Sequence, residues 1–205
     1  MHRSGPILLA STNPAKQAKL RWLLDGLGLR SITPGDLGLT PAIPEDGAGH
    51  RAIAEAKAAA WSRAAGMAAL SSDGGLVIPA LGDKWNALRT GRFAGENAGD
   101  RQRLDRLLEL MRPYHGLQRK AHWVEAAAIA SGGETLGSWQ ANSPAGLIAE
   151  EYDAARLVPG FWAFSVWRLP GDERAFAELS PEEQDQADDH WTRLRRQVRL
   201  FFDRV

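Results

Sequence analysis

The feature that most constrains the fold of this chain lies near its start, where an apolar run, a polar turn and an amphipathic segment follow one another. Residues 7–10, ILLA, are short enough to form a buried strand. A turn, Ser11-Thr12-Asn13-Pro14, comes next. After it, leucines recur at the spacing of one helix face, at Leu20, Leu23, Leu24 and Leu27. This order predicts a strand, a turn and a helix.

The turn also carries the groups that an anion needs. Asn13 is a good cap for the helix, and Pro14 suits its first position because proline has no N–H there to leave without a partner. Free backbone N–H groups and the positive end of the helix dipole favour an anion at such a turn. Ser11, Thr12 and Lys16 add hydroxyl and ammonium donors. The residues alone leave two interpretations open, a phosphate-binding turn or an ordinary, well-capped helix.

Composition excludes several classes of protein. The 205 residues include 25 basic and 25 acidic side chains, and this balance argues against a dedicated nucleic-acid binder. The absence of cysteine excludes thiol catalysis, disulfides and thiolate metal sites. No segment approaches the ~18 apolar residues of a membrane span, and the N-terminal apolar run is too short for a signal peptide. We therefore expect a cytoplasmic protein with neither a membrane nor a nucleic acid as its partner.

A second group of candidate residues follows in the chain. The loop that contains Glu45 precedes an alanine-rich helix over residues 52–65, and this helix carries Lys57. Residues 67–70 then suggest a buried strand, which Gly74 and Gly75 are expected to break directly after Asp73. A carboxylate at the end of a buried strand is a common ligand of Mg²⁺. Taken singly, Glu45 is equally well explained as an acid in a solvated loop. Lys57 is equally well explained as part of a solvated helix face.

The rest of the chain predicts one more helix, a β-rich middle and two C-terminal helices. Leucines at 104, 107 and 108 with Met111 form one apolar face of a helix that starts near Asp100. Residues 121–130 and 135–140 read as two strands joined by a turn at 132–133. Ser180, Pro181 and Glu183 form a capping box, and residues 187–201 carry a final apolar helix face.

Several short motifs resemble, in the same order, those of the inosine triphosphate pyrophosphatase family. Residues 11–16, STNPAK, are similar to its T-x-N-x-x-K signature. The acid and glycine at 45 and 47, the pair KA at 57–58 and the run SSDGGL at 71–76 resemble its next two motifs. RFAG at 92–95, GF at 160–161 and FAELSPEE at 176–183 continue the series. The likeness therefore spans nearly the whole chain.

The resemblance implies both a fold and an activity. The fold is α/β, with a central mixed β-sheet flanked by helices and two lobes that form a substrate cleft. The implied lobes are residues 1–115 with 180–205, and residues 116–179, of one domain that pairs as a homodimer. Members of the family are house-cleaning enzymes that hydrolyse nucleoside triphosphates of non-standard purines to the monophosphate and pyrophosphate.

The resemblance also assigns roles to residues. Asp73 is implied to be the general base and, with Glu45, a ligand of Mg²⁺ or Mn²⁺. The residues implied to stack on the purine and recognise it are Phe161, Trp162 and His190. His190 matches the family's histidine only after a shift of one residue. The other substrate contacts that the resemblance implies are Ser11, Thr12, Asn13, Lys16, Lys57, Gly74 and Arg92.

The chain departs from the family mainly where the base is read. Ser72 replaces the first acid of its motif, Ile53 replaces an asparagine, and Gln184 replaces a lysine. Ala163-Phe164 replaces a Tyr-Asp pair, and residues 188–191, DDHW, replace Ser-His-Arg. Three functions stay open: a pyrophosphatase with an altered base preference, a nucleotide-binding or partner-binding protein without catalysis, and a hydrolase of another phosphoanhydride. The acids at 188–189 would suit an amino-bearing base.

Overall fold

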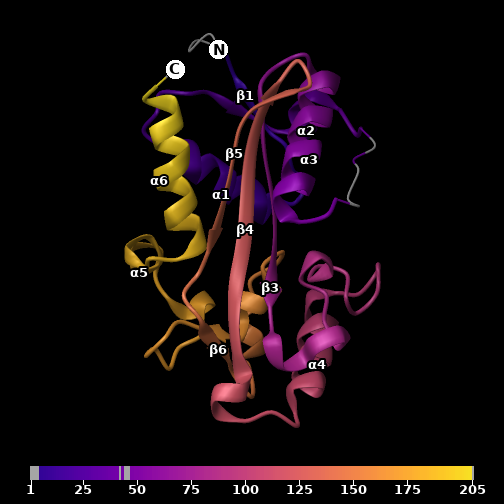
Figure 1. The fold of residues 1–205 in the computed structure, drawn as a ribbon, viewed down its shortest axis with the longest axis vertical. Helices are drawn as coiled ribbons and strands as arrows, with labels where there is room; N and C mark the ends of the chain where they lie inside the picture. Colours follow the sequence, from indigo (N-terminus) through magenta and orange to yellow (C-terminus); the bar gives the residue numbers. More distant parts are fainter. Residues whose placement is uncertain (1–4, 42, 44–46, 205) are drawn as a thin grey trace. The chain divides into compact units, whose positions relative to one another are not determined.

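The computed structural model describes residues 5–41, 43 and 47–204, so Glu45, a predicted metal ligand, lies outside the described residues (Figure 1). The chain divides into two compact units. The first comprises Met1–Gly74, Glu125–Ala141 and Trp191–Val205. The second comprises Gly75–Val124 and Asn142–His190.

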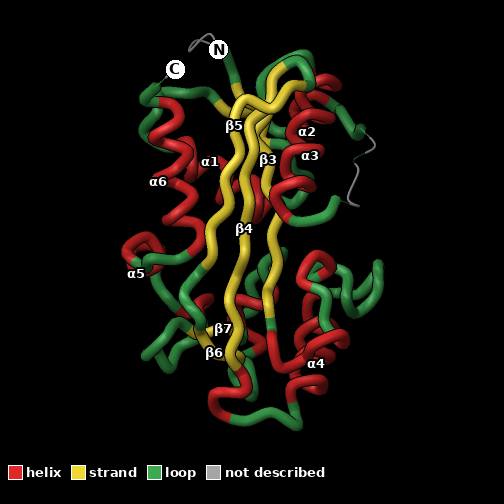
Figure 2. Tube along the Cα trace, in the orientation of Figure 1, coloured by secondary structure: helices red, strands yellow, loops and turns green. Residues whose placement is uncertain are grey.

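The first unit is built on a sheet in which β1 (Ile7–Leu9) lies between β2 (Ser31–Ile32) and β3 (Ala69–Val77), parallel to both. Strand β4 (Lys120–Ser131) neighbours β3, and β5 (Glu134–Asn142) pairs with β4 (Figure 2). The predicted strands over 7–10, 121–130 and 135–140 are therefore confirmed. The helices of this unit are α1 (Pro14–Leu24), α2 (Pro34–Leu37), α3 (His50–Ala65) and α6 (His190–Phe202), whose first residue belongs to the second unit.

Helix α1 begins as the sequence predicts. The side-chain oxygen of Asn13 accepts hydrogen bonds from the backbone N–H groups of Ala15 (2.9 Å) and Lys16 (3.4 Å), and Pro14 is the first helical residue. Leu20, Leu23 and Leu24 are buried. The extension of the helix to Leu27 is wrong, because α1 ends at Leu24 and two glycines with positive φ, at 26 and 28, turn the chain away.

Helix α3 packs closely on the sheet because the facing residues are small. Its alanines at 54 and 58 form one buried cluster with the alanines of β4 at 126, 128 and 130. The hydroxyl of Ser71 on β3 also donates to the carbonyl oxygen of Ala54. Without bulky side chains between them, the helix and the strands approach closely. Polar side chains on α3 can therefore reach β3.

Strand β3 does not end where the sequence predicts. It continues from Ala69 to Val77, through Asp73 and both glycines, so the predicted break at Gly74 and Gly75 is wrong. A Cβ atom added at Gly75 would lie 1.9 Å from the carbonyl oxygen of Ala87. The glycine is therefore required for a close approach of two backbone segments in the second unit, rather than for a turn.

The second unit contains helices α4 (Asp100–Met111) and α5 (Pro181–Gln186) and the strands β6 (Gly146–Ile148) and β7 (Trp167–Arg168). β6 pairs antiparallel with both β4 and β7. Buried side chains of α4 confirm the predicted apolar face at Leu104, Leu107 and Met111. The capping box of Ser180 and Glu183 is present at the start of α5. The 3₁₀-helices of the described residues also lie here, at 79–84, 87–89, 116–119, 154–156, 162–165 and 176–178.

The two units differ from the predicted lobes. Residues 75–115 belong to the second unit, and residues 125–141 belong to the first. The reason is that β3, β4 and β5 each contribute residues to both units, so the division crosses strands instead of falling in a loop. Hydrophobic periodicity carries no signal for such a boundary. Among the described residues, no helix has both the length and the hydropathy required to cross a membrane.

Candidate active site

Asp73 lies at the centre of a charged cluster in the first unit. One oxygen, Oδ1, accepts a hydrogen bond from Nζ of Lys57 at 2.8 Å, and Oδ2 lies 2.7 Å from Nδ1 of His50. His50 and Lys57 are seven residues apart on α3, so the helix presents both on the same face. The carboxylate is 14% exposed, and both of its oxygens are held in place.

A second ion pair belongs to the same cluster. Nζ of Lys16, in the first turn of α1, lies 3.4 Å from Oε1 of Glu125 on β4. The Glu125 side chain is only 2% exposed, while Lys16 is 20% exposed. The two pairs interact, because the charge of Lys16 also stabilises ionised Asp73. The cluster thus places two lysines, two carboxylates and a histidine around the start of a helix.

The surroundings shift the two carboxyl groups in opposite directions. Burial raises the pKa of Asp73, but the hydrogen bond from His50 and the charges of Lys16 and Lys57 outweigh it, so this pKa lies below its ordinary value of 3.8. Burial raises the pKa of Glu125 above its ordinary value, and the negative charge of Asp73 adds to that rise. Asp73 is therefore ionised at neutral pH and is the stronger candidate for a metal ligand or a base.

The lowered pKa of Asp73 predicts how stability depends on pH. On acidification the unfolded chain takes up this proton first, near pH 3.8, so the stabilisation from ionised Asp73 is complete above that pH and is lost as pH falls through the lower, folded-state pKa. The free energy of unfolding of the wild type should exceed that of Asp73→Asn at pH 7, by about 1–3 kcal/mol. Urea titrations of both proteins from pH 7 to about pH 3 should show this difference shrinking. A difference that grows on acidification would contradict the assignment.

The donor atoms of the cluster suit a hard divalent cation. Mg²⁺ takes oxygen ligands, usually one or two carboxylates with water and the phosphates of a substrate. Asp73 provides one such carboxylate, while no group of three or more histidine, cysteine or acidic side chains within 5–41, 43 and 47–204 is arranged to hold a metal ion. The described residues fit Mg²⁺ or Mn²⁺ bound together with a phosphate, rather than in a closed cage of protein ligands.

Comparison with known proteins places this cluster in a family. A family model described as "Ham1 family" matches residues 7–196, which include every member of the cluster. The chain belongs to the Ham1 family. Since this is the family whose motifs the sequence resembles, the predicted resemblance is confirmed.

Relatives of this Ham1 chain carry informative names. A "dITP/XTP pyrophosphatase" of an Anaeromyxobacter species is 32% identical and covers 97% of each chain. A protein of the same name from Mycobacterium bovis is 36% identical, covering 87% of this chain and 86% of its own. Among solved structures, a HAM1 protein from Coxiella burnetii aligns with a TM-score of 0.80 and 27% identity, over 98% of this chain and 99% of its own. The predicted α/β fold with a mixed sheet is thereby confirmed.

The predicted phosphate contacts of the Ham1 chain fall mostly at this cluster. Ser11, Thr12 and Asn13 precede α1, and the Ser11 hydroxyl accepts a hydrogen bond from the backbone N–H of Asn13 at 3.2 Å. Lys16 and Lys57 are in the cluster itself, and Gly74 follows Asp73 in β3. Arg92 belongs to the second unit, where it is 47% exposed and lies 3.7 Å from Glu96. Its contact with substrate stays a prediction.

The residues predicted to read the base are in the second unit and are buried. Phe161 stacks on Phe164, with 4.9 Å between ring centroids. Trp162 stacks on Phe93 at 5.6 Å. The aromatic residues at 161–167 also allow a different prediction from the sequence, a simple core strand. They are buried, but residues 162–165 form a 3₁₀-helix and only Trp167 of this run lies in a strand, β7.

His190, the third predicted base contact, is also enclosed. Its ring stacks on Trp123 at 5.7 Å, and its exposed fraction is zero. Phe164 and Trp167 lie against it at 6.0 and 6.5 Å. Burial of aromatic surface explains these positions without a ligand. That any of the three reads a base stays a prediction.

The sequence did not predict two members of the cluster, His50 and Glu125. Glu125 interrupts the run of apolar residues of β4, and an acid within such a strand is a sequence signal from which it could have been predicted. His50 precedes Lys57 by two helical turns, a spacing that places both on one face. His50 is 6% exposed, and its buried Nε2 atom has no hydrogen-bond partner among residues 5–41, 43 and 47–204.

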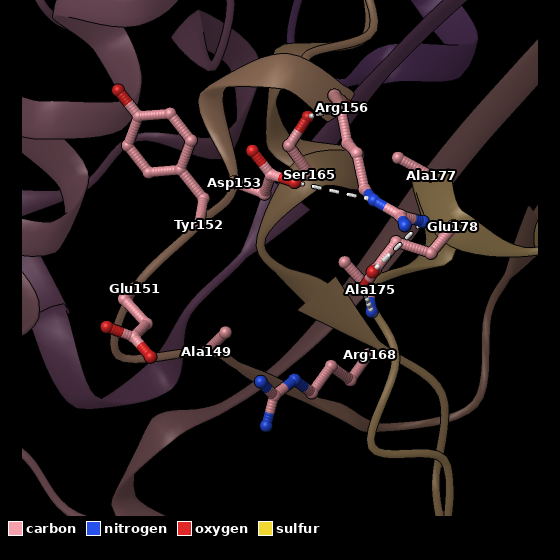
Figure 3. Close-up of a pocket in the computed structure, with 10 residues that line it drawn as sticks. All are labelled: Ala149, Glu151, Tyr152, Asp153, Arg156, Ser165, Arg168, Ala175, Ala177 and Glu178. Carbon is pink, nitrogen blue, oxygen red and sulfur yellow. Dashed lines mark hydrogen bonds and ion pairs between the residues drawn. The ribbon is translucent and has the colours of Figure 1, made fainter.

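A separate cavity of about 270 Å³ lies in the second unit (Figure 3). Its charged side chains are largely paired with one another. Arg156 lies 3.4 Å from Asp153 and 3.4 Å from Glu178. The cavity is lined by Ala149, Glu151, Tyr152, Asp153, Arg156, Ser165, Arg168, Ala175, Ala177 and Glu178. None of these ten lining residues is a predicted site residue, so the cavity does not help to locate the active site.

Proposed function

We propose that this Ham1-family chain is a nucleoside triphosphate pyrophosphatase that cleaves between the α- and β-phosphates to release the monophosphate and pyrophosphate. The observation that carries the proposal is Asp73, an ionised carboxylate held by His50 and Lys57 beside the cationic Lys16. The names of the relatives extend the proposal to the substrate, so dITP and XTP are the expected nucleotides.

The lysines and the start of α1 are the proposed triphosphate site. Backbone N–H groups and the helix dipole attract an anion there, and an ammonium group is a compact partner for phosphate. In the nucleotide-free chain, Lys16 and Lys57 lie against Glu125 and Asp73. A bound triphosphate brings its own negative charge, which competes for both lysines. Ser11, Thr12 and Asn13 would add hydrogen bonds at the same turn.

Asp73 is the proposed base. In its ionised form it accepts a proton from the water that attacks the α-phosphorus, and His50 orients it through Oδ2. Asp73 and the predicted ligand Glu45 would hold Mg²⁺ or Mn²⁺, which when bound neutralises charge that develops on the leaving pyrophosphate. A homodimer and a cytoplasmic location stay predictions.

The test is product formation from a panel of dITP, XTP, ITP and the four standard deoxynucleotides, with Mg²⁺. We expect monophosphate and pyrophosphate in equal amounts, and a faster reaction with the deaminated purines. Diphosphate with inorganic phosphate as products would show cleavage at the other anhydride and contradict the proposal. A reaction with standard nucleotides only would keep the chemistry and reject the substrate class.

Gln184 favours a second candidate, a nucleotide-binding protein without catalysis. The family has a lysine at this position, whereas the Gln184 side chain donates to the carbonyl oxygens of Phe176 (3.3 Å) and Leu179 (3.1 Å). The family's lysine, which the resemblance assigns to substrate binding, is thus replaced by the amide of Gln184, which has a structural role. Binding of dITP at saturating Mg²⁺ without release of pyrophosphate would support this candidate over the enzyme.

Variants of His50 should distinguish a role in positioning Asp73 from a purely structural role. His50→Ala removes the group that holds Oδ2 of Asp73, and kcat should fall about 10–100-fold, as it does when a partner of a metal ligand is lost. His50→Gln offers an amide N–H as a replacement donor and should retain most of the activity. Steady-state kinetics of both variants measure the effect. Equal losses in both variants would contradict a positioning role.

A further inference from the structure

Each lysine of the cluster has a carboxylate partner of its own. Nζ of Lys57 donates to Asp73 at 2.8 Å, and Nζ of Lys16 lies 3.4 Å from Oε1 of Glu125. Asp73 has two further proposed roles, as the general base and as a metal ligand. Glu125 has neither role, so its contact with Lys16 is the feature that can explain an acid at this position.

The two carboxylates lie on opposite faces of the sheet. The hydroxyl of Ser71 donates to a backbone carbonyl of α3, and alternate residues of a strand share a face, so Asp73 also faces α3. On β4, the alanines at 126, 128 and 130 pack against α3, which places Glu125 on the other face. Glu125 therefore acts on the site through its contact with Lys16.

Packing does not account for the charge of Glu125. Its side chain is 2% exposed and is followed in β4 by the buried alanines at 126–128. Burying a carboxylate is costly unless it is paired. Burial raises the pKa of Glu125, and the charge of Lys16 opposes that rise. Lys16 is 20% exposed, so its ammonium group reaches solvent while it lies against the buried carboxylate.

A phosphate group that binds Lys16 has to share or replace this contact. Carboxylate and phosphate are both anions that attract the same ammonium group, and two anions this close to one cation repel each other. Glu125 is fixed within β4 and enclosed, so it stays beside Lys16 when the phosphate arrives. The attraction of Lys16 for phosphate is therefore partly offset by Glu125.

We propose that Glu125 competes with phosphate for Lys16, and that it thereby weakens the binding of pyrophosphate at the start of α1 and speeds the release of this product. The inference rests on the proposed function, because pyrophosphate is the product of that reaction. When pyrophosphate leaves, Lys16 returns to Glu125, so its ammonium group has a partner in both states. Product release limits the rate of many enzymes, so such a competitor favours turnover.

The test is the binding of imidodiphosphate, a pyrophosphate analogue with a P–N–P bridge, measured by isothermal titration calorimetry with Mg²⁺ at neutral pH. Glu125→Gln removes the charge and keeps the size of the side chain, so its Kd should fall at least about fivefold below that of the wild type. Glu55→Gln is the matched control, since Glu55 is a partly exposed acid of α3 that accepts from Ser138. Its Kd should stay within about twofold of the wild type, because exposed charges are screened.

A double-mutant cycle assigns the effect to Lys16. Lys16→Met removes the ammonium group and should raise the Kd at least about fivefold. In that background, Glu125→Gln should change the Kd by less than about twofold, because a buried carboxylate without its cation takes up a proton and no ammonium group is left to compete for. A fall of equal size in both backgrounds would show repulsion without competition and would overturn the inference.

Two further results would overturn it: an unchanged or raised Kd in Glu125→Gln, or no binding of imidodiphosphate by either this variant or the wild type. A general structural defect weakens binding, so it cannot produce the tighter complex that we expect. If circular dichroism shows Glu125→Gln to be unfolded, Glu125→Ala replaces it with the same expected result, since alanine matches the residues that follow in β4.

Release of pyrophosphate from dITP by the wild type, measured in parallel, separates the two proposals. Release by the wild type together with an unchanged Kd in Glu125→Gln rejects the role of Glu125 and leaves the proposed function intact. A lowered Kd in Glu125→Gln, with no release by the wild type from any nucleotide, supports the competition for Lys16 and rejects the enzyme.

Discussion

Replacing Asp73 by asparagine is expected to lower kcat for pyrophosphate release by at least about 10³-fold. The reason is that a general base contributes about 10²–10⁴-fold and the same carboxylate is a proposed metal ligand. Asparagine keeps the size of the side chain and its ability to accept from Lys57. The fold should therefore persist, with the far-ultraviolet circular dichroism of the wild type. The measurement is steady-state release of pyrophosphate from dITP with Mg²⁺.

A matched control distinguishes the site from a general effect of charge. Asp83 is an exposed aspartate, and Asp83→Asn changes the net charge by the same amount. It should leave kcat within about twofold, as surface substitutions usually do. If Asp73→Asn retains more than about a tenth of the wild-type rate, Asp73 is not the general base, since such a loss is smaller than general-base catalysis contributes.

Replacing Gly75 by alanine is expected to lower the free energy of unfolding strongly. The new Cβ would lie 1.9 Å from the carbonyl oxygen of Ala87 and 2.8 Å from the Thr90 hydroxyl. A backbone carbonyl has little room to move, and the Thr90 hydroxyl is itself bonded to the Ala87 carbonyl and the Leu76 N–H. Overpacking of this kind costs about 3 kcal/mol or more. Chemical denaturation gives the free energy of unfolding directly.

Gly91→Ala is the control for this change. A Cβ at Gly91 meets no atom of the described residues within 4 Å, and the residue is exposed, so the free energy of unfolding should change by less than about 0.5 kcal/mol. Equal stability of Gly75→Ala and Gly91→Ala would show that the close approach of Gly75 to residue 87 is not needed for folding.

Much of the fold could be predicted because it depends on local signals. Asn13 and Pro14 specify the start of α1 by hydrogen bonding and by a fixed φ, and Ser180 with Glu183 specifies the start of α5. The order of the motifs predicted the family. Within the site, Lys16, Lys57 and Asp73 were predicted together and lie together in the structure.

What could not be predicted depends on contacts between distant residues. The glycine pair looked like a strand break, because only Ala87, twelve residues later, reveals why Gly75 must be glycine. Glu125 joins the site through a sheet neighbour and through Lys16, which is 109 residues away in sequence. Phe161 and Trp162 looked like open stacking surfaces, since their burial depends on partners such as Phe93.

The proposed attack of water at the α-phosphorus is tested most directly by hydrolysis of dITP by the wild type with Mg²⁺ in water enriched in ¹⁸O, followed by mass spectrometry of both products. We expect dIMP and pyrophosphate, with one ¹⁸O atom in dIMP. An ¹⁸O atom in pyrophosphate instead would place the attack at the β-phosphorus. Formation of dIDP and phosphate, or no turnover of dITP at all, would equally contradict a pyrophosphatase centred on Asp73.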